Sequence, residues 1–128
     1  KEQVMQFLFM VADFAKSYDI QILVEPVSID NSNFLNTLEE TDHFLKHILK
    51  DNLGAVLNTD LFRETKIILD DLLPYTDMIK LVHLGSETPN PGFLKILKEI
   101  NYRNPILLSE SASVDILNQY KTLWDHTI

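Results

Sequence analysis

The sequence contains no cysteine. Disulfide bridges, thiolate zinc sites and cysteine nucleophiles are therefore excluded from the chemistry of this chain. A chain without disulfides needs no oxidising compartment. We expect a cytoplasmic protein on this ground.

Basic residues are scarce, with 11 lysines and arginines against 19 aspartates and glutamates, and the formal net charge is −8. Nucleic-acid binding requires a concentrated positive surface, so we expect no nucleic-acid partner. No apolar run approaches the roughly 20 residues of a membrane span, and no signal segment opens the chain, so we expect no membrane association.

Glycine is also rare, with only three residues in 128. No glycine-rich phosphate loop follows any apolar run, which disfavours nucleotide binding. The sequence has no nucleophile-elbow motif either, which disfavours a serine hydrolase.

The length and composition indicate one globular domain spanning residues 1–128. Hydrophobic residues make up 45% of the chain and charged residues 23%, and no linker or low-complexity tract divides it. The chain is too short for a complete (β/α)8 barrel, which needs about 250 residues.

Four short apolar runs, each ending on a polar or ionisable residue, recur along the chain, and a helical pattern follows each of them. Their apolar residues are typical of parallel strands covered on both faces. A further helical pattern over residues 2–17 precedes the first run. The sequence thus predicts an α/β fold with four parallel strands and about five helices. The runs are Ile20–Val27, Leu53–Asn58, Ile79–Leu84 and Ile106–Glu110.

The polar residues that end these runs are Glu25, Asn58, His83 and Glu110. Since the carboxyl ends of parallel strands meet at one edge, we expect these four side chains to form a single site. The polar segment 28–36 after the first run is long enough to be a binding loop above it.

Several of these segments together, in their order and spacing, resemble the second half of the xylose isomerase-like TIM barrels. This superfamily includes sugar and sugar-phosphate isomerases and epimerases, inosose dehydratases, hydroxypyruvate isomerases and endonuclease IV enzymes. The resemblance covers essentially the whole chain and implies that it is the C-terminal half of such a barrel. The segments are Val24-Glu25-Pro26, Leu57-Asn58-Thr59, Leu81-Val82-His83-Leu84, Pro91-Gly92 with Phe93-Leu94-Lys95-Ile96-Leu97, and Asn101-Tyr102 followed by Leu108-Ser109-Glu110.

The resemblance implies a divalent cation (Mn²⁺, Mg²⁺, Co²⁺ or Zn²⁺) held at the barrel mouth by a glutamate, an aspartate, a histidine and a second glutamate. Glu25, His83 and Glu110 match three of these positions. In the family the two glutamates act as acid and base in a proton transfer between adjacent carbons, through a metal-stabilised enediolate. A small sugar or polyol is the substrate that this implies.

The second strand departs from the family pattern. The usual Asp-x-x-His motif is replaced by Asn58-Thr59-Asp60-Leu61. Asn58 offers the cation a neutral carbonyl oxygen, which weakens a site of this kind, while Asp60 has the parity to serve as a substitute ligand. Leu61 cannot replace a histidine.

Alternatives remain for both function and assembly. The chain is either a partial or degenerate isomerase or epimerase, or a catalytically inactive module with a sugar-binding or structural role. Four strands leave two open edges and one apolar face. We expect these to be covered by a missing N-terminal half-barrel or by a second copy of the chain. A free-standing open sheet of the flavodoxin type is the third arrangement.

Overall fold

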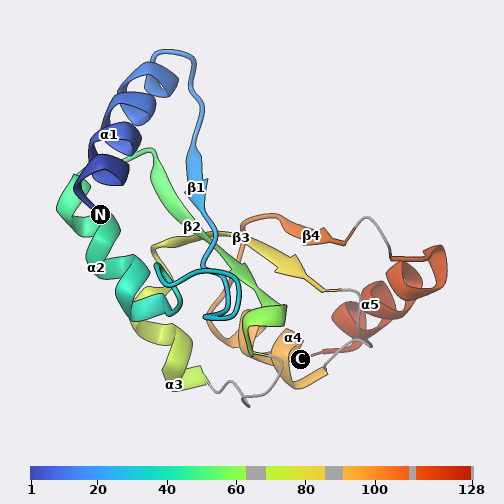
Figure 1. Cartoon of the computed structure of the whole chain (residues 1–128). Helices are drawn as coiled ribbons and strands as arrows, with labels where there is room; N and C mark the ends of the chain where they lie inside the picture. Colours follow the sequence, from blue (N-terminus) through green and yellow to red (C-terminus); the bar gives the residue numbers. More distant parts are fainter. Residues whose placement is uncertain (63–68, 86–90, 110–111, 128) are drawn as a thin grey trace.

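The structure is a computed structural model that describes residues 1–62, 69–85, 91–109 and 112–127. Helices and strands alternate along these residues (Figure 1). None of the described helices has the length and apolar character needed to cross a membrane. The elements are α1 (Glu2–Lys16), β1 (Ile22–Val24), α2 (Leu38–Ile48), β2 (Leu53–Asn58), the 3-10 turn η1 (Thr59–Phe62), α3 (Leu69–Leu72), the 3-10 turn η2 (Leu73–Tyr75), β3 (Ile79–Leu84), α4 (Pro91–Glu99), β4 (Ile106–Leu108) and α5 (Val114–His126).

The strands form one sheet in the order β1-β2-β3-β4, and every neighbouring pair is parallel. This confirms the predicted repetition of βα units. The register between β2 and β3 shifts between Ala55 and Val56, and beyond this point Asn58 pairs with His83. Paired residues of adjacent strands point to the same face, so the shift fixes which side chains meet at the ends of these strands.

One face of the sheet packs against the helices. Residues from β2 and β3 form the main core with Leu72 of α3 and with three side chains of α4. A smaller cluster joins α1 and α2 to β1 and to the start of β2. Burial of these side chains at about 25 cal/mol per Å² is the main force that holds the helices on this face. The main-core residues are Leu38, Ala55, Leu57, Leu72, Met78, Ile79, Val82, Leu84, Phe93, Leu94, Leu97 and Tyr102.

The opposite face carries Lys80, Leu81, His83 and Leu107, none of which is buried. Leu107 is 52% exposed although it lies within a strand. In Figure 1 the described helices follow the other side of the sheet, from α1 and α2 beside β1 to α5 beyond β4. The uncovered face and the two edge strands match the predicted incomplete barrel.

Helix α1 also presents a large apolar surface to solvent. Only Leu8, Ala12 and Ala15 are buried in this helix, whereas Phe7 and Phe14, which share their helical spacing in the sequence, are 59% and 69% exposed. The covered face of α1 is thus narrower than its apolar pattern predicts, since no other described element packs against the remainder.

Two strands are shorter than their apolar runs. β1 covers Ile22–Val24 within the predicted run 20–27, and β4 covers Ile106–Leu108. Pro26 is buried directly after β1. Because proline has no N–H to donate to a ladder, pairing stops before it.

Candidate functional site

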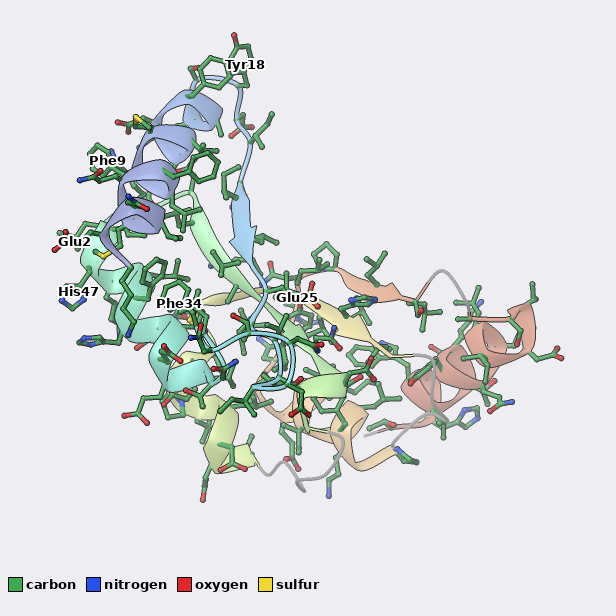
Figure 2. All side chains as sticks on the ribbon, viewed as in Figure 1. Glu2, Phe9, Tyr18, Glu25, Phe34 and His47 are labelled. Atoms are coloured by element: carbon green, nitrogen blue, oxygen red, sulfur yellow. The ribbon has the colours of Figure 1, made fainter. Side chains whose placement is uncertain are left out.

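Glu25 is the first described site residue along the chain, and it lies directly after the last residue of β1. Its side chain is 38% exposed. Figure 2 shows Glu25 over the middle of the sheet, whereas Phe9 and His47 lie on the outlying helices and Tyr18 lies in the turn after α1. The strand therefore places this carboxylate at the edge of the sheet where the strands end, as the sequence predicts. We call this edge the rim.

Asn58 and His83 occupy neighbouring positions at the ends of the next two strands. Asn58 is the last residue of β2 and pairs in register with His83 of β3. Both side chains point to the face that the helices leave uncovered. The register shift near Ala55 is what aligns them, and no sequence pattern announces that shift.

Three of the four predicted strand-end residues come together at one point. Asn58 Nδ2 donates a hydrogen bond to Glu25 Oε1 at 2.5 Å and lies 3.5 Å from His83 Nδ1. His83 Nδ1 is 3.7 Å from Glu25 Oε1. Asn58 can donate to His83 Nδ1 only in the tautomer in which that nitrogen carries no proton.

The other polar atom of Asn58 is also engaged. Asn58 Oδ1 accepts a hydrogen bond from the backbone N–H of Asp60 at 2.9 Å. This local Asx-type contact ties the end of β2 to η1. The orientation of the amide follows, because a flip would oppose two donors at Asp60 and two acceptors at Glu25.

Asp60 lies at the same rim but approaches the end of β3. Its carboxylate occupies the space beside Gly85, where a Cβ atom would come within 2.1 Å of Asp60 Oδ1. The Gly85 N–H donates to Thr59 Oγ1 at 2.9 Å, a second link between η1 and the end of β3. The sequence gives no sign of the bond between Gly85 and Thr59, because the two residues are far apart in the chain.

Glu110, the fourth strand-end residue, lies outside the described residues. The assignment of Glu110 as a ligand and acid–base group stays a prediction.

A cleft of about 760 Å³ with both polar and apolar lining opens beside Asn58. The segment after β1 supplies most of its wall, and the ends of β2 and η1 supply the rest. The cleft lies where the polar segment 28–36 was predicted to form a binding loop. The lining residues are Pro26, Val27, Ser28, Ile29, Asp30, Asn31, Asn36, Thr37, Asn58, Asp60 and Leu61.

The loop over the cleft is braced by Asn36. Its Nδ2 donates to the backbone oxygens of Val27 and Ser32, both at 2.8 Å. The Asn36 N–H donates to Glu40 Oε2 at 3.1 Å and lowers the pKa of that carboxyl. Thr37 Oγ1 accepts from the Glu40 N–H at 3.0 Å, so Thr37 is the N-cap of α2. Glu40 reaches back to Asn36 and not to the N-cap residue itself, one residue further than in a standard capping box.

A divalent cation at this point would need several donor atoms directed at it. Glu25 and His83 are suitable ligands, and their separation of 3.7 Å is compatible with a shared ion. Asn58, however, presents N–H groups to this point, and Asp60 is turned toward Gly85. No cluster of three histidine, aspartate or glutamate side chains suited to a metal occurs among the described residues. These residues as they stand therefore do not fit the cation that the resemblance implies.

The fold and the strand ends together define a class of protein. Parallel βα units with polar side chains at the carboxyl ends of the strands are typical of TIM barrels, and the described residues form half the strands of one. Neither a protein-family model nor a curated protein sequence matches the chain.

Solved structures, in contrast, match nearly the whole chain. One is a D-psicose 3-epimerase from Clostridium cellulolyticum H10 with D-tagatose, with a TM-score of 0.77 and 16% identity over 98% of this chain and 54% of that one. Another is a D-allulose 3-epimerase from Methylomonas sp., with a TM-score of 0.71 and 26% identity over 94% of this chain and 46% of that one. A third is the IOLI protein with a bound zinc atom, with a TM-score of 0.67 and 16% identity over 97% and 56% of the two chains.

The chain therefore has the fold of one half of a xylose isomerase-like TIM barrel. It spans about half the length of the structures that it matches. This confirms the predicted fold class and the resemblance.

Proposed function

We propose that this chain forms half of an isomerase or epimerase that acts on a neutral sugar or polyol, as the C-terminal half of the barrel. The observation that carries the proposal is the meeting of Glu25, Asn58 and His83 at one point, with Asn58 also lining the cleft. Two of the proteins with the same fold are sugar 3-epimerases, which supports the same class of substrate for this chain.

The chemistry of such a reaction sets the role of Glu25. Moving a proton between adjacent carbons of a hydroxy-carbonyl compound requires a base, an acid and a group that stabilises the developing oxyanion. Glu25 is the described carboxylate at the meeting point and is the base in this proposal. The acid on the other side is assigned to Glu110 from the resemblance.

The lining of the cleft favours an uncharged ligand over a sugar phosphate. Its side chains include hydroxyl and amide groups that pair with sugar hydroxyls, together with Asp30 and Asp60. The described lining contains no lysine, arginine or histidine. A phosphate group would meet the carboxylates of Asp30 and Asp60 there, with no cationic side chain in the described lining.

Binding without turnover is the second candidate, and Asn58 favours it. An amide at this position brings no negative charge to a cation, and its N–H already occupies one oxygen of Glu25. A site of this kind can recognise hydroxyl groups through the carboxylate and the amide without turning the ligand over.

The test follows both binding and proton transfer. The chain is incubated in D₂O with neutral ketohexoses and cyclic polyols, NMR monitors deuterium incorporation beside the carbonyl, and thermal unfolding reports binding. Turnover predicts deuterium incorporation that Glu25→Gln abolishes. Glu99→Gln is the matched control, because Glu99 is exposed and pairs only loosely with Lys95 at 3.7 Å.

The outcomes separate the candidates. A rise in Tm with sugar but without deuterium incorporation favours the binding module. No effect of any neutral sugar or polyol on Tm or on exchange would show that the proposed function is wrong. An equal or larger rise in Tm with sugar phosphates would overturn the assignment of a neutral ligand.

A further inference from the structure

The side-chain amide of Asn58 stands between two side chains that could share a cation. Its nitrogen lies 2.5 Å from Glu25 Oε1 and 3.5 Å from His83 Nδ1. The contact of Asn58 Oδ1 with the Asp60 N–H at 2.9 Å holds the amide in this orientation. A positively polarised group therefore faces the carboxylate at the centre of the rim.

The three distances show why this group competes with a metal ion. A divalent ion bound by both Glu25 and His83 would lie about 2.1 Å from each ligand atom. Given the 3.7 Å separation of those atoms, such an ion would stand no more than about 3.5 Å from the Asn58 nitrogen. Two positive centres this close in a partly dehydrated site repel each other. The amide oxygen cannot turn toward the ion without losing its own hydrogen bond and leaving the Asp60 N–H without this acceptor.

We infer that the amide of Asn58 takes the structural place of a divalent cation in this site. It neutralises part of the charge of Glu25, holds Glu25 and His83 at a fixed separation and makes the rim independent of metal. The inference concerns the organisation of the rim and does not depend on sugar binding, so its test uses cations alone.

Replacing the amide nitrogen of Asn58 by an oxygen atom should turn the rim into a cation site. Asn58→Asp keeps the size of the side chain and can still accept from the Asp60 N–H, but it directs a carboxylate oxygen at Glu25. Two carboxylates and an imidazole then face one point, which is a ligand set that Mn²⁺, Co²⁺ and Zn²⁺ bind. Without a cation the like charges repel each other, and the variant should be less stable than the natural chain.

The experiment measures thermal unfolding and isothermal titration of the chain with Mn²⁺ and Co²⁺, each with an EDTA control. The natural chain should show no saturable binding and no change in Tm on addition of cation or EDTA. Asn58→Asp should unfold at a lower temperature in EDTA and gain at least ~5 °C at a cation concentration about 100-fold above its Kd. His83→Ala in the Asn58→Asp background should remove that gain.

Two further variants guard the result. Asn33→Asp makes the same chemical change at an exposed position of the loop and should leave the cation response as in the natural chain. Asn58→Ala removes the hydrogen bonds of the amide to Glu25 and to the Asp60 N–H, so it should lower Tm without creating a response to cations. It serves as the test variant if Asn58→Asp does not fold.

Saturable binding of Mn²⁺ or Co²⁺ to the natural chain that His83→Ala abolishes would overturn the inference. A folded Asn58→Asp variant with no gain in cation affinity would also overturn it. A Tm for Asn58→Ala equal to that of the natural chain would show that the amide does not organise the rim.

Discussion

Asp60 and Gly85 are in contact where β2 and β3 end: a methyl group at position 85 would lie 2.1 Å from Asp60 Oδ1. Neither this glycine nor any other described glycine has a positive φ angle. A side chain at position 85 is therefore disfavoured because it would collide with the Asp60 carboxylate. The backbone conformation of Gly85 would not disfavour it.

Gly85→Ala should displace the Asp60 carboxylate and lower the free energy of unfolding by about 1–2 kcal/mol, because an added methyl group forces neighbouring groups to move. Gly92→Ala is the matched control. Gly92 is exposed within α4, where alanine is favoured over glycine by about 1 kcal/mol. Urea unfolding of both variants checks the prediction, and equal stability changes would contradict it.

Glu40 links the stability of the loop over the cleft to pH. The N–H of Asn36 is the largest cause that lowers the pKa of Glu40 from its ordinary value of 4.5. A carboxyl with a lowered pKa in the folded state stabilises the protein above its unfolded pKa, and this contribution is lost as the pH falls through the folded pKa. Glu40→Gln should therefore reduce the loss of Tm between about pH 5 and pH 3. Glu39→Gln, one residue earlier and exposed, should not, and thermal unfolding across this pH range distinguishes the two.

Tyr102 should titrate apart from the other tyrosines. Burial raises the pKa of Tyr102 to about 12, and its hydroxyl donates to the Pro105 carbonyl at 2.8 Å. The neutral form is thus favoured in the folded state, and its stabilising contribution is lost as the pH rises from about 10 to about 12. Ultraviolet titration near 295 nm should show one late phenolate that Tyr102→Phe removes. Tyr18→Phe, at a 64% exposed position, should leave that late phenolate in place.

The isolated chain should self-associate, because its sheet has an uncovered face and α1 exposes Phe7 and Phe14. Leu107→Lys should weaken the association by placing a charge on that face near β4. Leu73→Lys is the control at a similarly exposed position on the helix side, 49% exposed. Light scattering and sedimentation measure both variants, and a compact monomer at all concentrations would contradict the prediction.

The two candidate partners differ in their geometry. Helix α1 precedes β1 and α5 follows β4, so two copies that closed one barrel would bring two helices to each junction between their sheets. A complementary N-terminal half that brings one helix fewer to each junction between the two sheets would avoid this crowding. A symmetric dimer that forms only after residues 1–18 are removed would point to a second copy with a displaced helix α1.

The apolar runs in the sequence and the polar residues that end them were enough to predict the four strands, their parallel order and the strand-end positions of Glu25, Asn58 and His83. They failed at details that depend on neighbours. Leu49 continues the apolar spacing of α2 in the sequence, yet it is 85% exposed, because the helix ends there in a left-handed conformation that turns the residue outward. The exposure of one side of α1 could not be predicted either, since an apolar pattern does not show whether another element covers that side.

The sequence by itself determined the class of fold and the edge of the sheet at which polar side chains gather, because strand direction and the alternation of side chains are local properties. Only the tertiary structure decided which atoms of those side chains meet. The register shift near Ala55 aligned Asn58 with His83, and the N–H of Asp60 turned the amide nitrogen of Asn58, not its oxygen, toward Glu25. An asparagine in isolation is both a donor and an acceptor, and its surroundings choose between the two.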